Sequence, residues 1–223
     1  MKIDIITLFP EVFNNLNSFS IIKKAIENRK VKINTHNLRD YASNSRKVDD
    51  YPYGGIPGMV IKIEPIYNCV ATLKEKTEYD EIIYLTPDGS LLDQKMSNNM
   101  SNLDNIIIIC GHYKGIDHRV RENIVTKEIS IGNYVVSGGE LPAAVFCDSV
   151  IRLLPGVLGD ESSALSDTFQ DNLISAPIYT RPEVFNGLNV PKVLLSGNKK
   201  EIQKWNDEKS LERTKFLRPN LFD

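Results

Sequence analysis

The sequence predicts an α/β domain with a mostly parallel β-sheet. Short runs rich in β-branched residues alternate along the chain with stretches of helical periodicity, which is typical of that fold class. One run, Ile106–Ile109, consists of consecutive isoleucines with no polar position. A strand that is apolar on both faces belongs in the middle of a sheet that helices cover on both sides.

Five runs are predicted to be strands because β-branched residues dominate them. Each has the length of a strand and is too short for a globular helix. In chain order the predicted strands are Ile3–Leu8, Val31–His36, Glu81–Thr86, Asn105–Cys110 and Lys127–Ile131.

Helical periodicity fills most of the gaps between these runs. Ser20 is expected to cap a helix that runs to Asn28 and has an apolar stripe along one face. Leu141–Leu154 predicts another helix, in which Pro142 lies in the first turn, where proline is tolerated. The remaining predicted helices are one that starts at Pro65, one at Leu91–Met100, and one from Lys199 to about Lys215.

The composition is that of a soluble globular protein. The chain has 223 residues, of which 41% are hydrophobic and 25% charged, and its net charge is −2. Basic residues gather in Ile21–Lys47, which is either a face for a polyanion or a solvated helix surface. No apolar run is long enough to span a membrane, and Asp4 interrupts the apolar N-terminal stretch, so no signal peptide is indicated. We therefore expect a cytoplasmic protein.

Cysteine and histidine usage argues against disulfides and zinc. The cysteines Cys69, Cys110 and Cys147 are odd in number and have apolar neighbours, which indicates buried thiols in a reducing compartment. The three histidines have no cysteine or histidine partner at the spacing of metal ligands. No metal site is predicted from these residues.

Helical patterning stops at Pro155. Glycine, serine and aspartate prevail from there to Asn172, and a short region with one clear helix follows. The pattern predicts an α/β domain at residues 1–158, a flexible linker at 159–172 and a small helical C-terminal domain at 173–223.

Three of the predicted strands end in glycine-bearing loops. These loops are Pro87-Asp88-Gly89, Gly111 to Gly115, and Ser137-Gly138-Gly139. Because the carboxyl ends of parallel strands meet at one edge of a sheet, the loops could surround one small molecule. Taken singly, each is better explained as an ordinary tight turn, and only the three together favour a pocket. A further cluster, Tyr51–Met59, is either a rigid loop or a surface turn.

Ten motifs carry a resemblance that spans essentially the whole chain. In order they are LFPEVF, NLRDY, VDDYPYGGIPGM, LTPDG, CGHYKGIDHRV, SIGNYVVSGGELPA, RLLPGVLG, SALSDTF, YTRPEVF and VLLSGN. The sequence resembles the bacterial tRNA (guanine-N1)-methyltransferases of the TrmD family, within the SPOUT superfamily. Each motif alone is weak, whereas ten in the same order are specific.

The resemblance implies a fold that periodicity does not show. It implies a deep trefoil knot whose loops bind S-adenosylmethionine, a homodimer with shared active sites, and a C-terminal domain that binds tRNA. The implied product is a guanosine methylated at ring nitrogen 1, immediately 3′ of the anticodon.

The resemblance also implies a set of cofactor-binding residues in the three glycine-bearing loops. Their backbone groups would contact the adenine, and no phosphate-binding motif is needed because the cofactor has no phosphates. The residues are Leu85, Thr86, Pro87, Gly111, Tyr113, Ile131, Gly132, Asn133, Tyr134, Val135, Val136, Gly138 and Gly139.

Two catalytic residues follow from the same motifs. Ring nitrogen 1 of guanine carries a proton at neutral pH, so a base must remove that proton as the methyl group arrives. The family's general base corresponds to Asp167, and the arginine that stabilises charge on the guanine carbonyl oxygen corresponds to Arg152. By chemistry alone Asp160 and Asp171 are equally suitable carboxylates.

Further residues are implied to contact the tRNA. Asp49, Pro57 and Gly58 match the family's rigid loop around the extruded guanine, and Lys204 and Arg213 could meet phosphates. Magnesium is associated with the family's catalysis, although no dedicated carboxylate cluster for it is evident.

The chain departs from the commoner family pattern at three positions. Lys114 stands where an acid is usual, Asn133 where an aspartate is usual, and Ile56 where a glycine is usual. The first two remove negative charge near the implied cofactor. Two alternatives therefore stay open: a non-catalytic knotted RNA-binding protein, and a SPOUT methyltransferase with a different RNA target.

Overall fold

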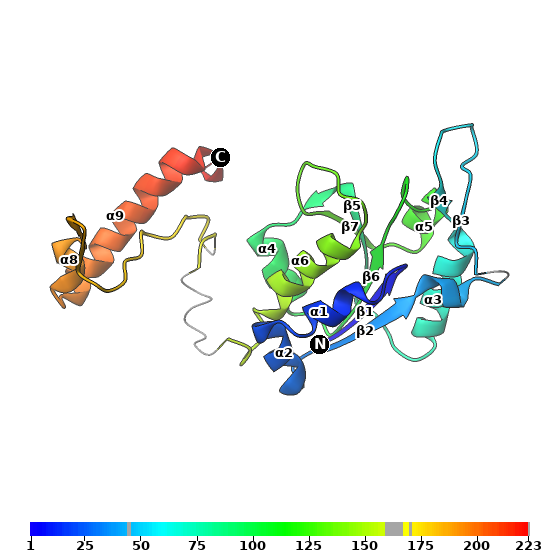
Figure 1. The fold of residues 1–223 in the computed structure, drawn as a ribbon, viewed down its shortest axis with the longest axis horizontal. Helices are drawn as coiled ribbons and strands as arrows, with labels where there is room; N and C mark the ends of the chain where they lie inside the picture. The colour runs from blue at the N-terminus through cyan, green and yellow to red at the C-terminus, as the bar shows by residue number, and fades with distance from the viewer. Residues whose placement is uncertain (44–45, 159–166, 170, 223) are drawn as a thin grey trace. The chain divides into compact units, whose positions relative to one another are not determined.

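The computed structural model describes all residues except 44–45, 159–166, 170 and 223. The chain divides into two compact units, Met1–Gly159 and Asp160–Asp223, each described here by itself (Figure 1). The predicted linker at 159–172 falls mostly on residues outside the described ones. The three-part division of the chain therefore stays a prediction.

A five-stranded parallel sheet forms the centre of the first unit. Its strand order is β2-β1-β6-β5-β7, and all four pairings are parallel. The all-isoleucine strand β6 lies in the middle, and Ile106–Ile109 are each at most 1% exposed. The predicted α/β class, parallel sheet and central strand are confirmed. The strands are β1 (Lys2–Thr7), β2 (Lys32–Asn37), β5 (Glu81–Leu91), β6 (Asn105–Cys110) and β7 (Lys127–Ser130).

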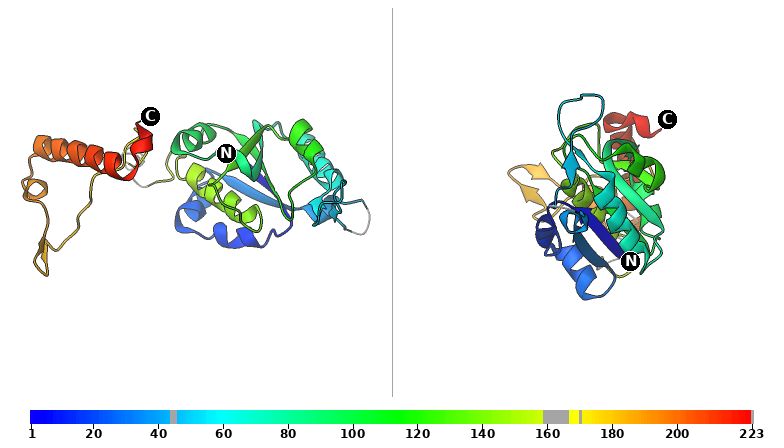
Figure 2. Two further views of the ribbon diagram at one scale, coloured as in Figure 1. Left: turned by 90° about the horizontal axis from the view of Figure 1, so that it is seen from above. Right: turned by 90° about the vertical axis from the view of Figure 1, so that its right-hand side faces the viewer.

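Helices cover both faces of this sheet (Figures 1 and 2). Alternation along β1 sends Ile3 and Ile5 to one core and Ile6 to the other. The first core lies under α1 (Val12–Leu16), α2 (Ser20–Glu27), α4 (Gln94–Met100) and α6 (Glu140–Ile151). The second lies under α3 (Ile63–Lys74) and α5 (His118–Asn123).

Two local predictions about helix starts are wrong. Ser20 is the first residue of α2 and not its cap, because the extended N-cap residue is Phe19 and no side chain caps the helix. Leu91 belongs to β5, and α4 starts three residues later, where Asp93 accepts a hydrogen bond from the Met96 backbone N–H at 2.6 Å. A carboxylate cap therefore determines the start of α4.

The strand β5 is longer than predicted and contains an irregularity. Its pairing with β7 shifts register between Leu85 and Ser90, so the expected exit Pro87-Asp88-Gly89 is a bulge inside the strand. A Cβ on Gly89 would lie 2.6 Å from the Glu128 carbonyl carbon, so the two backbones touch there. Glycine permits this close approach.

The remaining elements of the first unit are short. A two-stranded antiparallel ladder, β3 (Asp49–Asp50) with β4 (Val60–Ile61), carries the loop predicted to surround the guanine. A 3-10 helix, η1 (Leu38–Tyr41), follows β2.

All three cysteines are buried free thiols, as predicted, and burial raises the pKa of Cys69 and of Cys147 to about 12.

The second unit contains one long helix, α9 (Lys199–Leu217), close to its predicted span. Asn198 caps it, accepting from the backbone N–H of Lys200 at 3.2 Å. The unit also contains β8 (Val184–Phe185) paired with β9 (Leu188–Asn189), the short α8 (Lys192–Leu195) and η2 (Pro219–Leu221).

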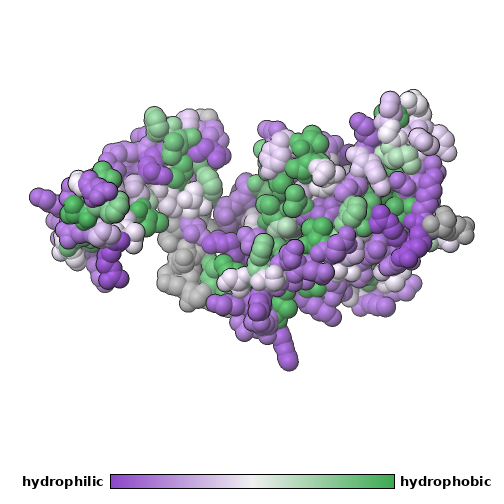
Figure 3. Space-filling model, in the orientation of Figure 1, coloured by the Kyte–Doolittle hydropathy of each residue, from purple (hydrophilic) through white to green (hydrophobic). Residues whose placement is uncertain are grey.

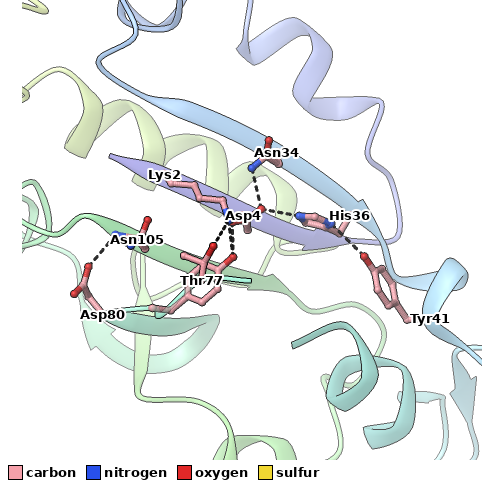
Figure 4. A network of polar contacts seen from close by, with 9 residues as sticks. Lys2, Asp4, Asn34, His36, Tyr41, Thr77, Asp80 and Asn105 are labelled. Carbon is pink, nitrogen blue, oxygen red and sulfur yellow. Dashed lines mark hydrogen bonds and ion pairs between the residues drawn. The ribbon is translucent and has the colours of Figure 1, made fainter. Parts of the chain in front are cut away.

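A buried carboxylate joins β1 to its neighbours (Figure 4). Asp4 has a side chain only 1% exposed, and it accepts from Asn34 Nδ2 at 2.9 Å and from Tyr79 Oη at 2.7 Å. His36 Nε2 and Lys2 Nζ complete the set, at 2.7 and 2.9 Å. Burial alone would raise the pKa of Asp4, but these hydrogen bonds outweigh burial and hold it well below its ordinary value of 3.8.

We expect Asp4→Asn to lower the free energy of unfolding by about 3 kcal/mol at pH 7, because a buried group loses its charge-assisted hydrogen bonds. A depressed folded-state pKa means that this stabilisation is complete above the unfolded-state pKa and is lost as pH falls below it. Urea unfolding at pH 7 and pH 3 measures both effects. The exposed Asp104→Asn is the control, and an equal loss for the two variants would contradict the role of Asp4.

Candidate active site

Loops from three neighbouring strands of the sheet enclose a cavity of about 450 Å³. Its lining comes from β5 and its bulge, from the loop after β6, and from the segment between β7 and α6. The glycine-bearing exits that the sequence predicted to meet do lie together. The volume is in the range of small-molecule sites.

Twelve of the thirteen predicted cofactor residues line this cavity. The exception is Asn133, which is exposed and does not line it. The lining members are Leu85, Thr86, Pro87, Gly111, Tyr113, Ile131, Gly132, Tyr134, Val135, Val136, Gly138 and Gly139.

The segment before α6 crosses directly over the end of β6. The Gly139 backbone N–H donates to the Gly111 carbonyl at 2.9 Å, and His112 and Gly138 form an isolated antiparallel bridge. A Cβ on Gly139 would lie 2.7 Å from Cys110 Cα and 2.8 Å from Gly111 N. Any side chain at Gly139 would displace backbone, so this crossing requires glycine.

A buried carboxylate stands behind the crossing. Glu140 is 5% exposed and lies in the first turn of α6, where the helix dipole favours negative charge. It accepts from Thr7 Oγ1 at 2.6 Å and pairs with His112 Nε2 at 2.6 Å. Glu140 thereby holds the imidazole of His112, which lines the cavity.

An arginine on α5 ties the bulge of β5 to β7. Arg121 donates from Nε and Nη2 to the two carboxylate oxygens of Glu128, at 2.7 and 2.6 Å, and from Nη2 to Asp88 at 2.8 Å. Its guanidinium lies 5.6 Å from the centre of the Tyr84 ring. The hydroxyl of Thr86 and the guanidinium of Arg121 hold the pKa of Asp88 below its usual range. The charges of Arg121 and Asp88 are therefore already engaged.

The loop predicted to surround the guanine is joined to the cavity wall. The Lys114 backbone N–H donates to the Met59 carbonyl at 3.0 Å, and the Ile61 N–H donates to the Gly115 carbonyl at 3.0 Å. A Cβ on Gly58 would lie 3.0 Å from Lys114 Cγ. Asp49 interacts with Tyr113, which lines the cavity. Burial, and after it the Asp49 carboxylate, raises the pKa of the Tyr113 hydroxyl.

The two predicted catalytic residues lie in different units. Arg152 is the half-buried C-cap residue of α6, and its backbone N–H donates to the Asp148 carbonyl at 3.3 Å. Asp167 is half-buried in the second unit. Of the two alternative carboxylates, Asp171 is exposed and Asp160 lies outside the described residues. The pairing of Asp167 with Arg152 stays a prediction.

The remaining predicted tRNA contacts also differ in exposure. Pro57 is exposed in the loop between β3 and β4. Lys204 has a side chain 78% exposed on α9, where it lies 3.9 Å from Glu208. Arg213 is half-buried on the same helix, and its Nε is a buried atom without a hydrogen-bond partner among the described residues.

Sequence reasoning did not assign several residues that line the cavity. His112 lies in a loop whose glycines were noticed in the sequence, so its position there could have been used to predict it. Lys114 of the same loop was placed near the cofactor only as a departure from the family pattern. Arg121 lies on a helix six residues beyond Gly115, and no local pattern places it at the cavity. Tyr84 faces the cavity from a strand whose apolar run indicated only burial.

Comparison with known proteins identifies the family. The family model for tRNA (Guanine-1)-methyltransferase TrmD matches residues 1–223. The chain belongs to the TrmD family. Three similar curated proteins are each named tRNA (guanine-N(1)-)-methyltransferase. They come from Bacteroides fragilis (55% identical), Christiangramia forsetii (56%) and Flavobacterium psychrophilum (57%), and the matches cover 100% of this chain and 99–100% of each relative.

Membership of the TrmD family covers both units of the chain. Among the described residues, no group of three acidic, histidine or cysteine side chains could hold a metal ion. In the same part of the chain, every helix is too short or too polar to cross a bilayer.

Proposed function

We propose that this chain transfers the methyl group of S-adenosylmethionine to ring nitrogen 1 of the guanosine immediately 3′ of the anticodon in tRNA. The observation that carries this proposal is the cavity where three strand exits of a TrmD-family chain meet. The printed names of the relatives support the reaction and the substrate class.

The cavity suits S-adenosylmethionine in size and in chemistry. At about 450 Å³ it has room for a nucleoside with an amino-acid tail. Backbone groups beside Gly111 and Gly138 are close at hand, and glycines let a ligand approach them. The Arg121 and Asp88 charges already pair with each other, which leaves polar backbone and apolar walls for an adenine ring.

In the proposed mechanism, two side chains of the chain control a proton and a charge. When bound, S-adenosylmethionine supplies an electrophilic methyl group. Asp167 accepts the proton from ring nitrogen 1 of the guanine, which frees the electron pair. Arg152 donates to the guanine carbonyl oxygen, on which negative charge develops. Magnesium stays a prediction without an assigned ligand set.

In the proposed complex, the chain holds the RNA at two places. Asp49, Pro57 and Gly58 surround the extruded guanine, and the contact of Gly58 with cavity-lining Lys114 supports their place beside the cofactor. Lys204 meets phosphates from α9, since its ammonium is exposed. Arg213 is half-buried, so it contributes less than Lys204 to the contacts with phosphates.

The proposal includes a homodimer and a trefoil knot. Apolar side chains gather on the surface near α6 and the loop before it (Figure 3), and a second copy of the chain would cover them. The exposed members include Tyr134, Val135 and Leu141, at 56, 82 and 62% exposure. The crossing of Gly139 over the end of β6 supports the knot.

Methyl transfer to tRNA transcripts that differ only at the base 3′ of the anticodon tests the proposed function. We expect incorporation into the transcript with guanosine and none into transcripts with adenosine, cytidine or uridine there. Methylation of another position would favour a SPOUT enzyme with a different target. RNA binding without cofactor binding at millimolar S-adenosylmethionine would favour the non-catalytic alternative.

A further inference from the structure

The loop Tyr51–Met59 projects from the first unit between β3 and β4 (Figure 1), and two of its tyrosine side chains are exposed. Tyr51 is 78% exposed and Tyr53 is fully exposed, at 100%. Gly54 and Gly55 follow with φ angles of +84° and +74°, and nothing lies within 4 Å of a Cβ built on either. These glycines are therefore required by the backbone conformation of the turn and not by close packing. The turn leaves both tyrosines exposed to solvent.

The base of this loop lies against a cation, Lys114, that has no acidic partner among the described residues. The stem of Lys114 packs on Gly58, with Cγ, Cε and Cδ at 3.0, 3.3 and 3.7 Å from a Cβ built there. Within the described part of the chain, no ion pair or hydrogen bond engages the Lys114 ammonium. The flanking cations differ, because Lys47 pairs with Asp50 at 3.4 Å and Lys62 with Glu64 at 3.8 Å.

A loop with exposed tyrosine rings, whose base contacts a lysine that is unpaired among the described residues, fits single-stranded RNA. Unstacked bases bind on aromatic side chains, and the phosphates between them need cations. Extrusion of a target base leaves its neighbours without a stacking partner, and a tyrosine ring can replace the lost contact. The backbone hydrogen bond from Lys114 to Met59 joins the base of this loop to a residue that lines the cavity.

We propose that Tyr51, Tyr53 and Lys114 form a docking surface for the nucleotides that flank the target guanosine. The tyrosine rings stack on the bases that extrusion uncovers, and Lys114 Nζ binds a backbone phosphate. This inference rests on the proposed function, because it supplies the RNA-binding part of the same site.

Binding of an anticodon stem-loop RNA to the full-length chain tests the surface. We expect Tyr53→Ala and Tyr51→Ala each to raise the Kd for RNA roughly five- to a hundredfold, while Tyr53→Phe keeps wild-type affinity because stacking needs the ring alone. Tyr67→Ala is the matched control, since this tyrosine is 58% exposed and belongs to α3 instead of the loop. Unchanged RNA binding in the double variant Tyr51→Ala/Tyr53→Ala would overturn the proposal for the rings.

The lysine is tested by its salt dependence and by cofactor binding. We expect Lys114→Met to reduce the slope of log Kd for RNA against log salt by about 0.7 to 1, and calorimetry measures the Kd for S-adenosylmethionine of the same variant. Lys74→Met on α3 is the control and should leave both quantities at wild-type values. A weaker cofactor and unaltered RNA binding would instead assign Lys114 to the cofactor carboxylate and overturn the phosphate contact.

The two proposals fail in distinguishable ways. If the wild-type chain transfers no methyl group to tRNA, but the tyrosine variants bind RNA more weakly than it does, the proposed function is contradicted and the docking surface is supported. A wild-type chain that methylates the guanosine 3′ of the anticodon, with all surface variants equal to it, supports the proposed function and contradicts the surface. Thermal unfolding of each variant establishes that the chain is folded.

Discussion

Asp167→Asn is expected to lower kcat for methyl transfer to tRNA by roughly 10²- to 10⁴-fold, the contribution of a well-placed general base. Asparagine has the shape of aspartate but cannot accept the proton of ring nitrogen 1, so the electron pair stays unavailable. Affinity for S-adenosylmethionine should stay at the wild-type value, because the cavity-lining residues all belong to the first unit and Asp167 to the second. Single-turnover kinetics together with calorimetry measures both quantities.

Asp171→Asn is the matched control, because it makes the same change four residues along the chain in an exposed carboxylate. It should methylate tRNA at the wild-type rate. Full activity in Asp167→Asn, with activity lost in Asp171→Asn, would move the base to the other carboxylate. Loss of activity in both would point to the charge of the segment and away from a single proton acceptor.

Arg152→Gln is expected to reduce kcat by roughly 10²- to 10³-fold, the effect of removing one donor from a developing oxyanion. Glutamine is neutral and shorter than arginine, so the variant removes both the positive charge and the donor groups that reach the oxygen. Arg152→Lys should lie between wild type and Arg152→Gln, because it keeps the charge and loses the planar fork of the guanidinium. The same kinetic assay gives both values, and the Kd for tRNA shows whether binding changes as well.

Arg152 also ends α6, so its replacement affects the helix dipole as well as the reaction. Arg29→Gln is the control, because Arg29 directly follows Asn28, the C-cap residue of α2, and is exposed. Both variants should lose less than about 1 kcal/mol of stability from the dipole. Equal kinetic losses in the two variants would contradict a catalytic role for Arg152.

The local sequence pattern predicted the strands well, because a strand that is buried on both faces consists of consecutive apolar residues. The run Ile106–Ile109 indicated a central strand, and β6 is central with both neighbours parallel. Helix starts were predicted less well. The serine at position 20 has the chemistry of a cap, but Phe19 takes the cap position, and Leu91 is paired with Ser130 of β7 instead of starting a helix.

The candidate site divides in the same way. Glycines mark the loops of the cavity in the sequence, because only glycine permits contacts such as that of Gly139 with Cys110 and Gly111. The charged side chains that fix the positions of those loops cannot be recognised in the sequence in the same way. Arg121 reaches Asp88 across 33 positions of the chain, and Glu140 reaches Thr7 across 133. These hydrogen bonds form only when the folded chain brings distant residues together, so neither residue type nor sequence spacing predicts them.

The sequence by itself determined the α/β class, the central strand, the buried cysteines and, through ten ordered motifs, the family. Each of these depends on the identity of neighbouring residues. Only the tertiary structure decided that twelve of the predicted cofactor residues share one cavity, that Asn133 does not line it, and that Lys114 lies against Gly58 without an acidic partner among the described residues. These features arise from contacts between segments far apart in the chain, whose energies appear only once the sheet has brought the segments together.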